Sequence, residues 1–496
     1  MRLTKLSELT VEYRMALLNA IVFSILSFAE LLFPPKNLAL VLLPNVLFLL
    51  CSLAIWIQMM RNGWALTPVC WFILGSGLFF GFGVIAGGMQ AHPWSEKIYG
   101  DSTQHLLRAN TLNSFSVLTV LVISALFAPP AQKQIPLETS TENSWKWKRL
   151  FRCVSIFALA VVSLRLIFFP DVENLILRSI LAKAYFLLPS AFLLLGIFFR
   201  ELGKAELTFL GIAFFLQTLQ GILLFNKLEI LMPSVALVMG VWVSARSYKL
   251  PLAALMLPVM IFWVANPLVS MGRLHYRYDA SLNTLYERVE ILTDTVTASL
   301  IKKRTFLNPQ GQVRDTLNIT ERMNIRERIR GVAIRFDVAS VQGFLINEYD
   351  AGRPGNTLTD FLAVLVPRVF WPEKPIITRF GPELSVKYHN NDPAHGSSAM
   401  APTYTGEAYW NMGWFGVLAV SAYLGICFGL LSRPALAASQ GKNLAYLFIA
   451  YPLLISAAFV ESWITSTYIG GMATIVVYYF MIKIAISMIG RGDQSA

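Results

Sequence analysis

The chain has 496 residues, of which 55% are apolar and 13% aromatic but only 14% charged. Soluble globular proteins carry about 25% charged residues, so this composition excludes an ordinary soluble enzyme, a disordered chain and a nucleic-acid-binding protein. The net charge is +12. In a membrane protein the basic residues must be counted for each side of the bilayer before a polyanionic partner can be inferred from that charge. The composition predicts an integral membrane protein with many spans.

Apolar segments follow one another along most of the chain. A helix that crosses a bilayer needs about 20 mostly apolar residues, and about twelve segments meet that length. We therefore expect an all-α polytopic membrane protein with about 12 transmembrane helices. The predicted spans are 15–33, 38–57, 65–86, 111–128, 150–168, 181–199, 205–225, 229–245, 250–271, 413–432, 443–460 and 467–488.

Basic residues in the short connections predict the orientation. If the N-terminus is cytoplasmic, the inside loops and tails hold 16 Lys and Arg residues and the short outside loops hold 5. This imbalance has the sign that the positive-inside rule requires. We therefore expect both termini to be cytoplasmic.

One connection, residues 272–412, is far longer than the others and lies outside the cytoplasm in this topology. It carries 17 Lys and Arg against 15 Asp and Glu. Apolar repeats predict an amphipathic helix from Leu282 to Leu300 and a second helical stretch over 319–345. The apolar stretch 361–370 is too short to span and predicts an interfacial or re-entrant element.

These features predict three parts. About nine helices form an N-terminal membrane bundle over 1–271, and the large, partly helical external loop over 272–412 holds the candidate active site. About three further membrane helices follow over 413–496.

Charged residues, histidines, prolines and glycines are concentrated between residues 335 and 416. The prolines and glycines of this stretch indicate a fixed, irregular backbone. Asn411 is expected to cap a helix that enters the membrane at Gly413, which would hold Glu407 close to the membrane surface. Among the cations and histidines of the stretch are Arg335, Arg368, Lys374, Arg379, His389 and His395.

Each candidate also has a structural interpretation. The arginines fit ordinary ion pairs, and Glu407 fits a carboxylate near the positive end of a helix dipole. Trp371, Tyr409 and Trp410 fit anchors at a membrane surface. Arg165 is different, because it lies near the outer end of a predicted span. A charge within a span is a functional-site hypothesis, although its side chain can also reach the interface.

The sequence lacks the motifs of several common enzyme classes. It has no GxxxxGK[ST] phosphate loop, no HExxH, no GxSxG and no DxD metal pair. Its four cysteines all lie in apolar stretches, so neither a disulfide framework nor a CxxC metal site is expected. We expect no cofactor, and a transfer site would neutralise phosphate charge with arginine and lysine instead of Mg²⁺.

Two runs of the segment form a recognisable pattern. The first is Pro367-Arg-x-x-Trp371-Pro-x-Lys374-Pro, and the second is Gly406-Glu407-x-Tyr409-x-Asn411-x-Gly413-x-x-Gly416. The pattern resembles the bacterial oligosaccharide repeat-unit polymerases of the Wzy type, which are O-antigen and exopolysaccharide polymerases. The specific match covers about 80 residues. The wider layout, with one large external loop before the last three spans, covers the whole chain.

The resemblance implies a membrane glycosyltransferase of the bacterial inner membrane, similar to the metal-independent, GT-C-like enzymes that use lipid phosphates. Such an enzyme transfers a growing glycan from undecaprenyl diphosphate to the non-reducing end of an incoming lipid-linked repeat unit at the periplasmic face. Its implied partners are the undecaprenyl-diphosphate-linked oligosaccharide and the bilayer, with a chain-length regulator protein as a further candidate. Nucleic acid is not among them.

The resemblance also suggests roles for individual residues. Arginine suits a diphosphate because its planar fork makes paired hydrogen bonds and stays charged. Either Glu407 or His395 would take the proton from the acceptor hydroxyl. The residues expected to bind the diphosphate or the rest of the substrate are Arg335, Arg368, Lys374, Arg379, Arg165 and Tyr409.

Three other functions fit parts of the sequence. An O-antigen ligase would use the same donor with another acceptor, but the Trp-Pro-x-Lys-Pro run favours the polymerase. A repeat-unit flippase or other transporter commonly shows two related halves and charged sites near the midplane. This chain has no evident internal repeat. A scaffold for an export complex accounts for the spans but not for the ordered Arg, Glu and His segment.

Overall fold

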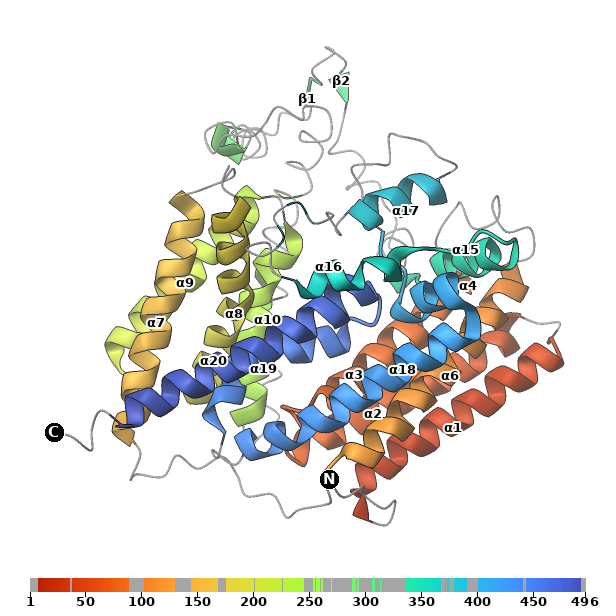
Figure 1. The fold of residues 1–496 in the computed structure, drawn as a ribbon, viewed down its shortest axis with the longest axis horizontal. Coiled ribbons are helices and arrows are strands. Elements are labelled where there is room, and N and C mark those ends of the chain that lie inside the picture. Colours follow the sequence, from red (N-terminus) through yellow and green to blue (C-terminus); the bar gives the residue numbers. More distant parts are fainter. Residues whose placement is uncertain are drawn as a thin grey trace. The chain divides into compact units, whose positions relative to one another are not determined.

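A computed structural model gives the fold (Figure 1). The residues that it describes are 8–35, 38–88, 102–129, 144–167, 175–199, 201–224, 226–244, 336–366, 371, 373, 379–389, 400–439 and 443–491, with scattered residues between 253 and 314.

The chain divides into two compact units. The first unit comprises Met1–Pro136, Ile325–Tyr446 and Leu453–Ala496, and the second comprises Leu137–Asn324 and Leu447–Pro452. The predicted division into three parts concerns the sides of a membrane and stays a prediction.

The first unit holds the N-terminal helices, the C-terminal helices and short helices between them. Its N-terminal elements are α1 (Val11–Leu32), α2 (Leu38–Arg61), α3 (Pro68–Ser76), the π-helical η2 (Gly77–Phe82), α4 (Gly83–Gly88) and α6 (Ser102–Phe127). Its later elements are α15 (Ala339–Asp350), the 3₁₀ turn η5 (Thr357–Asp360), α16 (Phe361–Leu365), α17 (Phe380–Tyr388), α18 (Tyr404–Ser439), the π-helical η8 (Ile464–Gly471) and α20 (Met472–Arg491). Helix α19 (Leu444–Ala458) contributes residues to both units.

Helix α6 is central to the first unit, because it packs against α1 on one side and α18 on another (Figure 1). Two glycines spaced four residues apart allow the close approach of α18. A Cβ on Gly425 would lie 2.8 Å from the carbonyl oxygen of Val120, and one on Gly429 would lie 2.6 Å from that of Ser124. Small residues at this spacing are typical of helix contacts in membranes.

Short helices form a polar layer at one end of this bundle. Helix α15 packs on α4, α6 and α18, and α16 packs on η8. The start of α15 is fixed by Asp337, whose carboxylate accepts hydrogen bonds from the backbone N–H and the hydroxyl of Ser340. Lys387 of α17 bonds to Glu348 of α15. We call α15, η5, α16 and α17 the polar layer.

The second unit contains four packed helices, α7 (Ser144–Ile167), α8 (Leu175–Phe198), α9 (Lys204–Leu223) and α10 (Lys227–Ser244). Gly196 and Gly240 lie where α8 meets α10, and a Cβ on either would meet the backbone of the other helix. The described residues also include two short antiparallel strands, β1 (Phe306–Leu307) and β2 (Val313–Arg314).

The prediction of an all-α polytopic membrane protein agrees with this fold. Within the described part of the chain, seven helical stretches are long and apolar enough to cross a membrane. Three shorter apolar helices add to them, and the total of about 12 stays a prediction. The predicted span 250–271 and the helix predicted from Leu282 to Leu300 fall mostly outside the described residues. The seven stretches are Val11–Leu32, Leu40–Arg61, Pro68–Ala86, Leu106–Phe127, Lys204–Leu223, Tyr404–Ser439 and Ile464–Ile484.

The helix expected to begin at Gly413 is present, and a shorter helix that begins at Tyr404 precedes it within α18. The Thr403 hydroxyl accepts the backbone N–H of Gly406 and so caps this first helix. The helix breaks at Met412 and Gly413, and Gly413 has φ +59°, a conformation that favours glycine. Asn411 does not cap the second part. Its side chain bonds to the η5 segment, as described below.

Two other predicted elements also differ in extent. The helical stretch expected over 319–345 is described only from residue 336, and its helix α15 runs on to Asp350. The interfacial element expected over 361–370 contains only the five-residue helix α16 in its described part, and this helix packs against η8. Phe361 and Leu365 of this helix are exposed, which is compatible with an interfacial position, and that position stays a prediction.

Candidate functional site

Glu407 lies fully buried at the junction of three segments of the first unit. Its Oε1 accepts hydrogen bonds from the hydroxyls of Thr357, at 2.7 Å, and Thr465, at 3.2 Å. Its Oε2 accepts the backbone N–H of Ile464 at 2.5 Å. A buried carboxylate is costly unless it is hydrogen-bonded, and these donors meet that need. The carboxylate therefore ties α18 to η5 and to the start of η8.

Asn411 completes this junction one helical turn after Glu407. Its side-chain amide donates to the Thr357 hydroxyl at 2.9 Å and to the Glu407 carbonyl oxygen at 2.8 Å. Its Oδ1 accepts the backbone N–H of Leu358 at 3.2 Å. The conformation of η5 is thus held from α18 by two side chains. With η5 and η8 in these positions, the Glu407 carboxylate is closed to solvent.

A buried polar network lies beside this junction, between α6, α15 and the start of α18. The amides of Asn113 and Gln342 bond to each other in both directions, at 3.0 and 2.7 Å. Gln342 Nε2 also lies 2.6 and 2.7 Å from the hydroxyl oxygens of Thr403 and Thr405, and its two hydrogens serve two of these three acceptors at a time. All four side chains belong to buried residues. Satisfied buried networks fix a unique packing, and this one fixes where α18 begins.

Arg108, Asp350 and Tyr409 form a second group near the surface. Arg108 of α6 pairs with Asp350 at the end of α15, and the Tyr409 hydroxyl donates to the same carboxylate at 3.1 Å. The side chains of Arg108 and Asp350 are about one-third exposed, at 30% and 37%. The predicted substrate residue Tyr409 is therefore buried against an aspartate.

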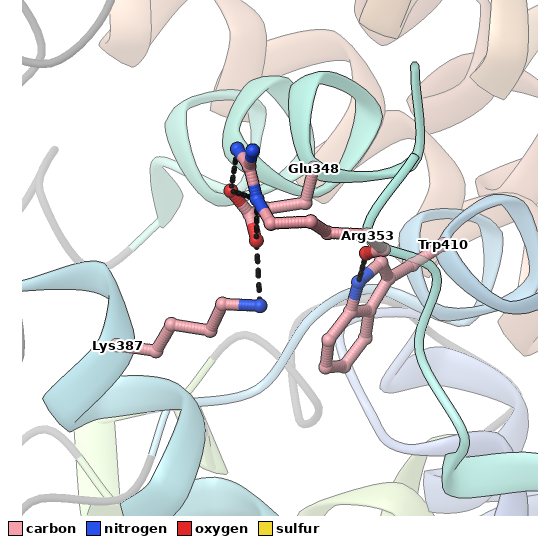
Figure 2. Close-up of polar contacts among 4 residues, drawn as sticks. All are labelled: Glu348, Arg353, Lys387 and Trp410. Carbon is pink, nitrogen blue, oxygen red and sulfur yellow. Dashed lines mark hydrogen bonds and ion pairs between the residues drawn. The ribbon is translucent and has the colours of Figure 1, made fainter. Parts of the chain in front are cut away.

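Arg353, in the loop after α15, and Lys387 of α17 form a third group with Glu348, which Figure 2 shows. Glu348 of α15 receives three hydrogen bonds from Arg353, at 2.6 to 3.1 Å, and one ion pair from Lys387 of α17, at 2.5 Å. The Trp410 indole N–H donates to the Arg353 carbonyl oxygen at 3.1 Å. Side-chain exposure is 61% for Arg353 and 37% for Lys387, but only 9% for Glu348.

This group predicts a pH dependence of stability. Hydrogen bonds from Arg353, and then Lys387, lower the pKa of Glu348 in spite of its burial. A lowered folded-state pKa adds stability that is fully present above the unfolded-state pKa, about 4.3 for Glu, and is lost as the pH falls through the folded-state pKa. The difference in melting temperature between the wild type and Glu348→Gln is therefore expected to be largest above about pH 5 and to vanish in acid. A difference that grows on acidification would contradict this.

The remaining described candidates are paired with carboxylates. Arg379 lies 3.5 Å from Asp360 and 3.8 Å from Glu383, and its side chain is half exposed. Arg165 belongs to the second unit, where it donates to Glu229 at 2.8 Å. Glu229 therefore provides a counter-charge for Arg165, which lies within a predicted span.

Four predicted site residues, Arg335, Arg368, Lys374 and His395, lie outside the described residues. The structure thus brings Glu407, Tyr409 and Arg379 into one unit with the polar layer, and their predicted roles stay predictions. His389 is described, and its Nδ1 lies 2.7 Å from the Ser385 carbonyl oxygen.

The sequence analysis missed the amide network and the Glu348–Arg353–Lys387 group. Asn113 in an apolar segment carried a signal for the network, because a polar amide within a span needs a partner. The ion-pair group gave no such signal, because Lys387 lies far along the chain from Glu348 and Arg353, in a stretch that holds many charged residues. Among the described residues, no set of three His, Cys, Asp or Glu side chains could hold a metal ion.

No family model, curated protein or solved structure matches this chain.

Proposed function

We propose that the protein polymerises lipid-linked oligosaccharide repeat units. It would transfer the growing glycan from undecaprenyl diphosphate to the non-reducing end of an incoming lipid-linked unit at the periplasmic face of the bacterial inner membrane. About 12 spans and a GT-C-like arrangement belong to the same proposal. The resemblance of residues 335–416 to repeat-unit polymerases supports it.

The observation that carries the proposal is the location of these motif residues. Glu407, Tyr409 and Asn411 lie together where the polar layer covers a bundle of membrane-type helices. A lipid-linked sugar donor needs an apolar surface for its tail, cations near its phosphates and polar groups around its sugars. Apolar helices and half-exposed arginines meet the first two needs.

In the proposed reaction, the acceptor hydroxyl oxygen forms a bond to the anomeric carbon of the donor glycan. The bond from that carbon to the diphosphate oxygen breaks, and the undecaprenyl diphosphate leaves with the electron pair. Arg335, Arg368 and Lys374, with Arg379 or Arg165, would stabilise the charge on the leaving group. Glu407 or His395 would accept the hydroxyl proton.

Loss of the protein in its native cells tests this function directly. A polymerase defect is expected to leave a single repeat unit attached to the final carrier, because export and ligation continue without chain extension. The measurement is the length distribution of the cell-surface glycan on a gel, with the intact gene restored as control. Complete absence of the glycan would contradict polymerisation and would favour a ligase or a flippase.

A further inference from the structure

The Glu348–Arg353–Lys387 group of the first unit carries an unbalanced charge. Two cations share one carboxylate, and both ion-pair distances, 2.6 Å for Arg353 and 2.5 Å for Lys387, are short. The group is therefore net positive by one charge. Arg353 Nε and Lys387 Nζ both contact the Oε2 atom of Glu348, at 3.1 and 2.5 Å (Figure 2). A phosphate group has several oxygen atoms and can bridge two cations that share a neighbour in this way.

The cations are held in place rather than free to move. The Arg353 carbonyl oxygen accepts the Trp410 indole N–H, and the Lys387 ammonium lies 5.3 Å from the centre of the Trp410 ring. Gly355 packs so closely on that ring that a Cβ would lie 2.6 Å from it. The loop that carries Arg353 is thus fixed against α18, and a bound anion would need little reorganisation.

Donors of this group remain available to a ligand. Arg353 uses Nε and Nη2 for Glu348, and within the described residues its Nη1 makes no hydrogen bond. Lys387 directs one described ion pair to Glu348, and an ammonium has three donors. Both side chains are substantially exposed.

The chain around Trp410 places the group next to an apolar surface. Directly after Trp410 come the helix break and then Trp414, Phe415 and Leu418, which are 45%, 67% and 46% exposed. A span that begins after the break would turn these apolar side chains toward lipid, and Trp410 would then lie at the interfacial level, where tryptophan is enriched. Such a position would bring Arg353 and Lys387 near the level of lipid phosphate groups.

We propose that Arg353 and Lys387 form a binding site for a phosphate group carried by a lipid. The guanidinium offers a planar pair of donors, and the ammonium adds a point charge beside it. Glu348 holds both cations in position. This inference rests on the proposed function where the lipid is the diphosphate-linked substrate, and a phospholipid headgroup has the same chemistry.

Binding without turnover tests the site. The probes are farnesyl diphosphate, inorganic pyrophosphate and the phospholipid phosphatidylglycerol, offered to the full-length protein in phosphatidylcholine nanodiscs. Arg353→Gln and Lys387→Gln are each expected to weaken farnesyl diphosphate binding about tenfold or more, because each removes a charge-assisted contact. Competition by phosphatidylglycerol would assign the site to headgroups, whereas preference for farnesyl diphosphate would assign it to the substrate.

Two controls separate an anion site from a structural ion pair. Arg152→Gln removes a similarly exposed arginine paired with a buried glutamate, Glu206, and should leave binding unchanged. Glu348→Gln keeps both cations and an amide oxygen that can still accept from them, and it removes the only negative charge of the group, so binding should strengthen. A loss of binding as large as that of the cation variants would overturn the site. Equal binding by the wild type and both cation variants would overturn the site. Chain extension is measured separately, so that result would leave the polymerase proposal standing.

Discussion

Glu407→Ala is expected to destabilise the first unit by about 3–5 kcal/mol, because it strands three buried donors and leaves a cavity. The donors are the hydroxyls of Thr357 and Thr465 and the backbone N–H of Ile464. Glu407→Gln should cost far less. Its amide oxygen can accept the Ile464 N–H, and its NH₂ group can donate to a threonine hydroxyl. Melting temperatures in detergent measure the difference between the two variants.

The same variants address the catalytic base. If Glu407 takes the proton, Glu407→Gln should abolish chain extension while its melting temperature stays near that of the wild type. If His395 takes it, His395→Ala should abolish extension and Glu407→Gln should keep it. Near-normal polymer length in both variants would contradict both assignments. Comparable melting temperatures for Glu407→Ala and the wild type would show that the hydrogen bonds of Glu407 do not hold η5 and η8.

Gly425→Ala and Gly429→Ala are expected to destabilise the first unit by about 1–3 kcal/mol each, in spite of the higher helix propensity of alanine. Their Cβ atoms would approach backbone carbonyl oxygens of α6 to 2.8 and 2.6 Å. Backbone atoms cannot rotate aside as side-chain ends can, so α18 would have to move away from α6. Melting temperature and monodispersity in detergent are the measurements.

Gly211→Ala is the matched control for these substitutions. Gly211 also lies within an apolar helix, α9, but a Cβ there meets nothing within 4 Å. Replacing it should be neutral or stabilising by up to about 1 kcal/mol. An equal loss at all three glycines would mean that the effect comes from detergent or expression and not from the α6–α18 contact.

The sequence predicts the elements of this fold better than their junctions. Apolar length and spacing located the helices α1, α2 and α6, because burial in a bilayer imposes the same length on every span. The membrane helix expected from Gly413 follows the break in α18, but the short helix from Tyr404 before the break was not predicted. Thr403 caps that short helix by accepting the backbone N–H of Gly406.

Glu407 of the candidate site was selected from the sequence, but its contacts were not, because they join residues that are distant along the chain. Glu407 was selected because it lies in the most specific stretch of the sequence, but its full burial depends on Thr357, 50 residues away. The Glu348–Arg353–Lys387 group likewise joins α15 and α17, which are distant along the chain. Pairings between residues so far apart leave no periodicity in a single sequence.

Reconstitution gives the most direct test of the polymerase proposal. The purified protein in liposomes is supplied with undecaprenyl-diphosphate-linked repeat units taken from the native organism, labelled in the sugar, without added metal. The account predicts a ladder of lipid-linked products that differ by one repeat unit, with release of undecaprenyl diphosphate in equal amount. Unchanged single units in the presence of folded protein would contradict it.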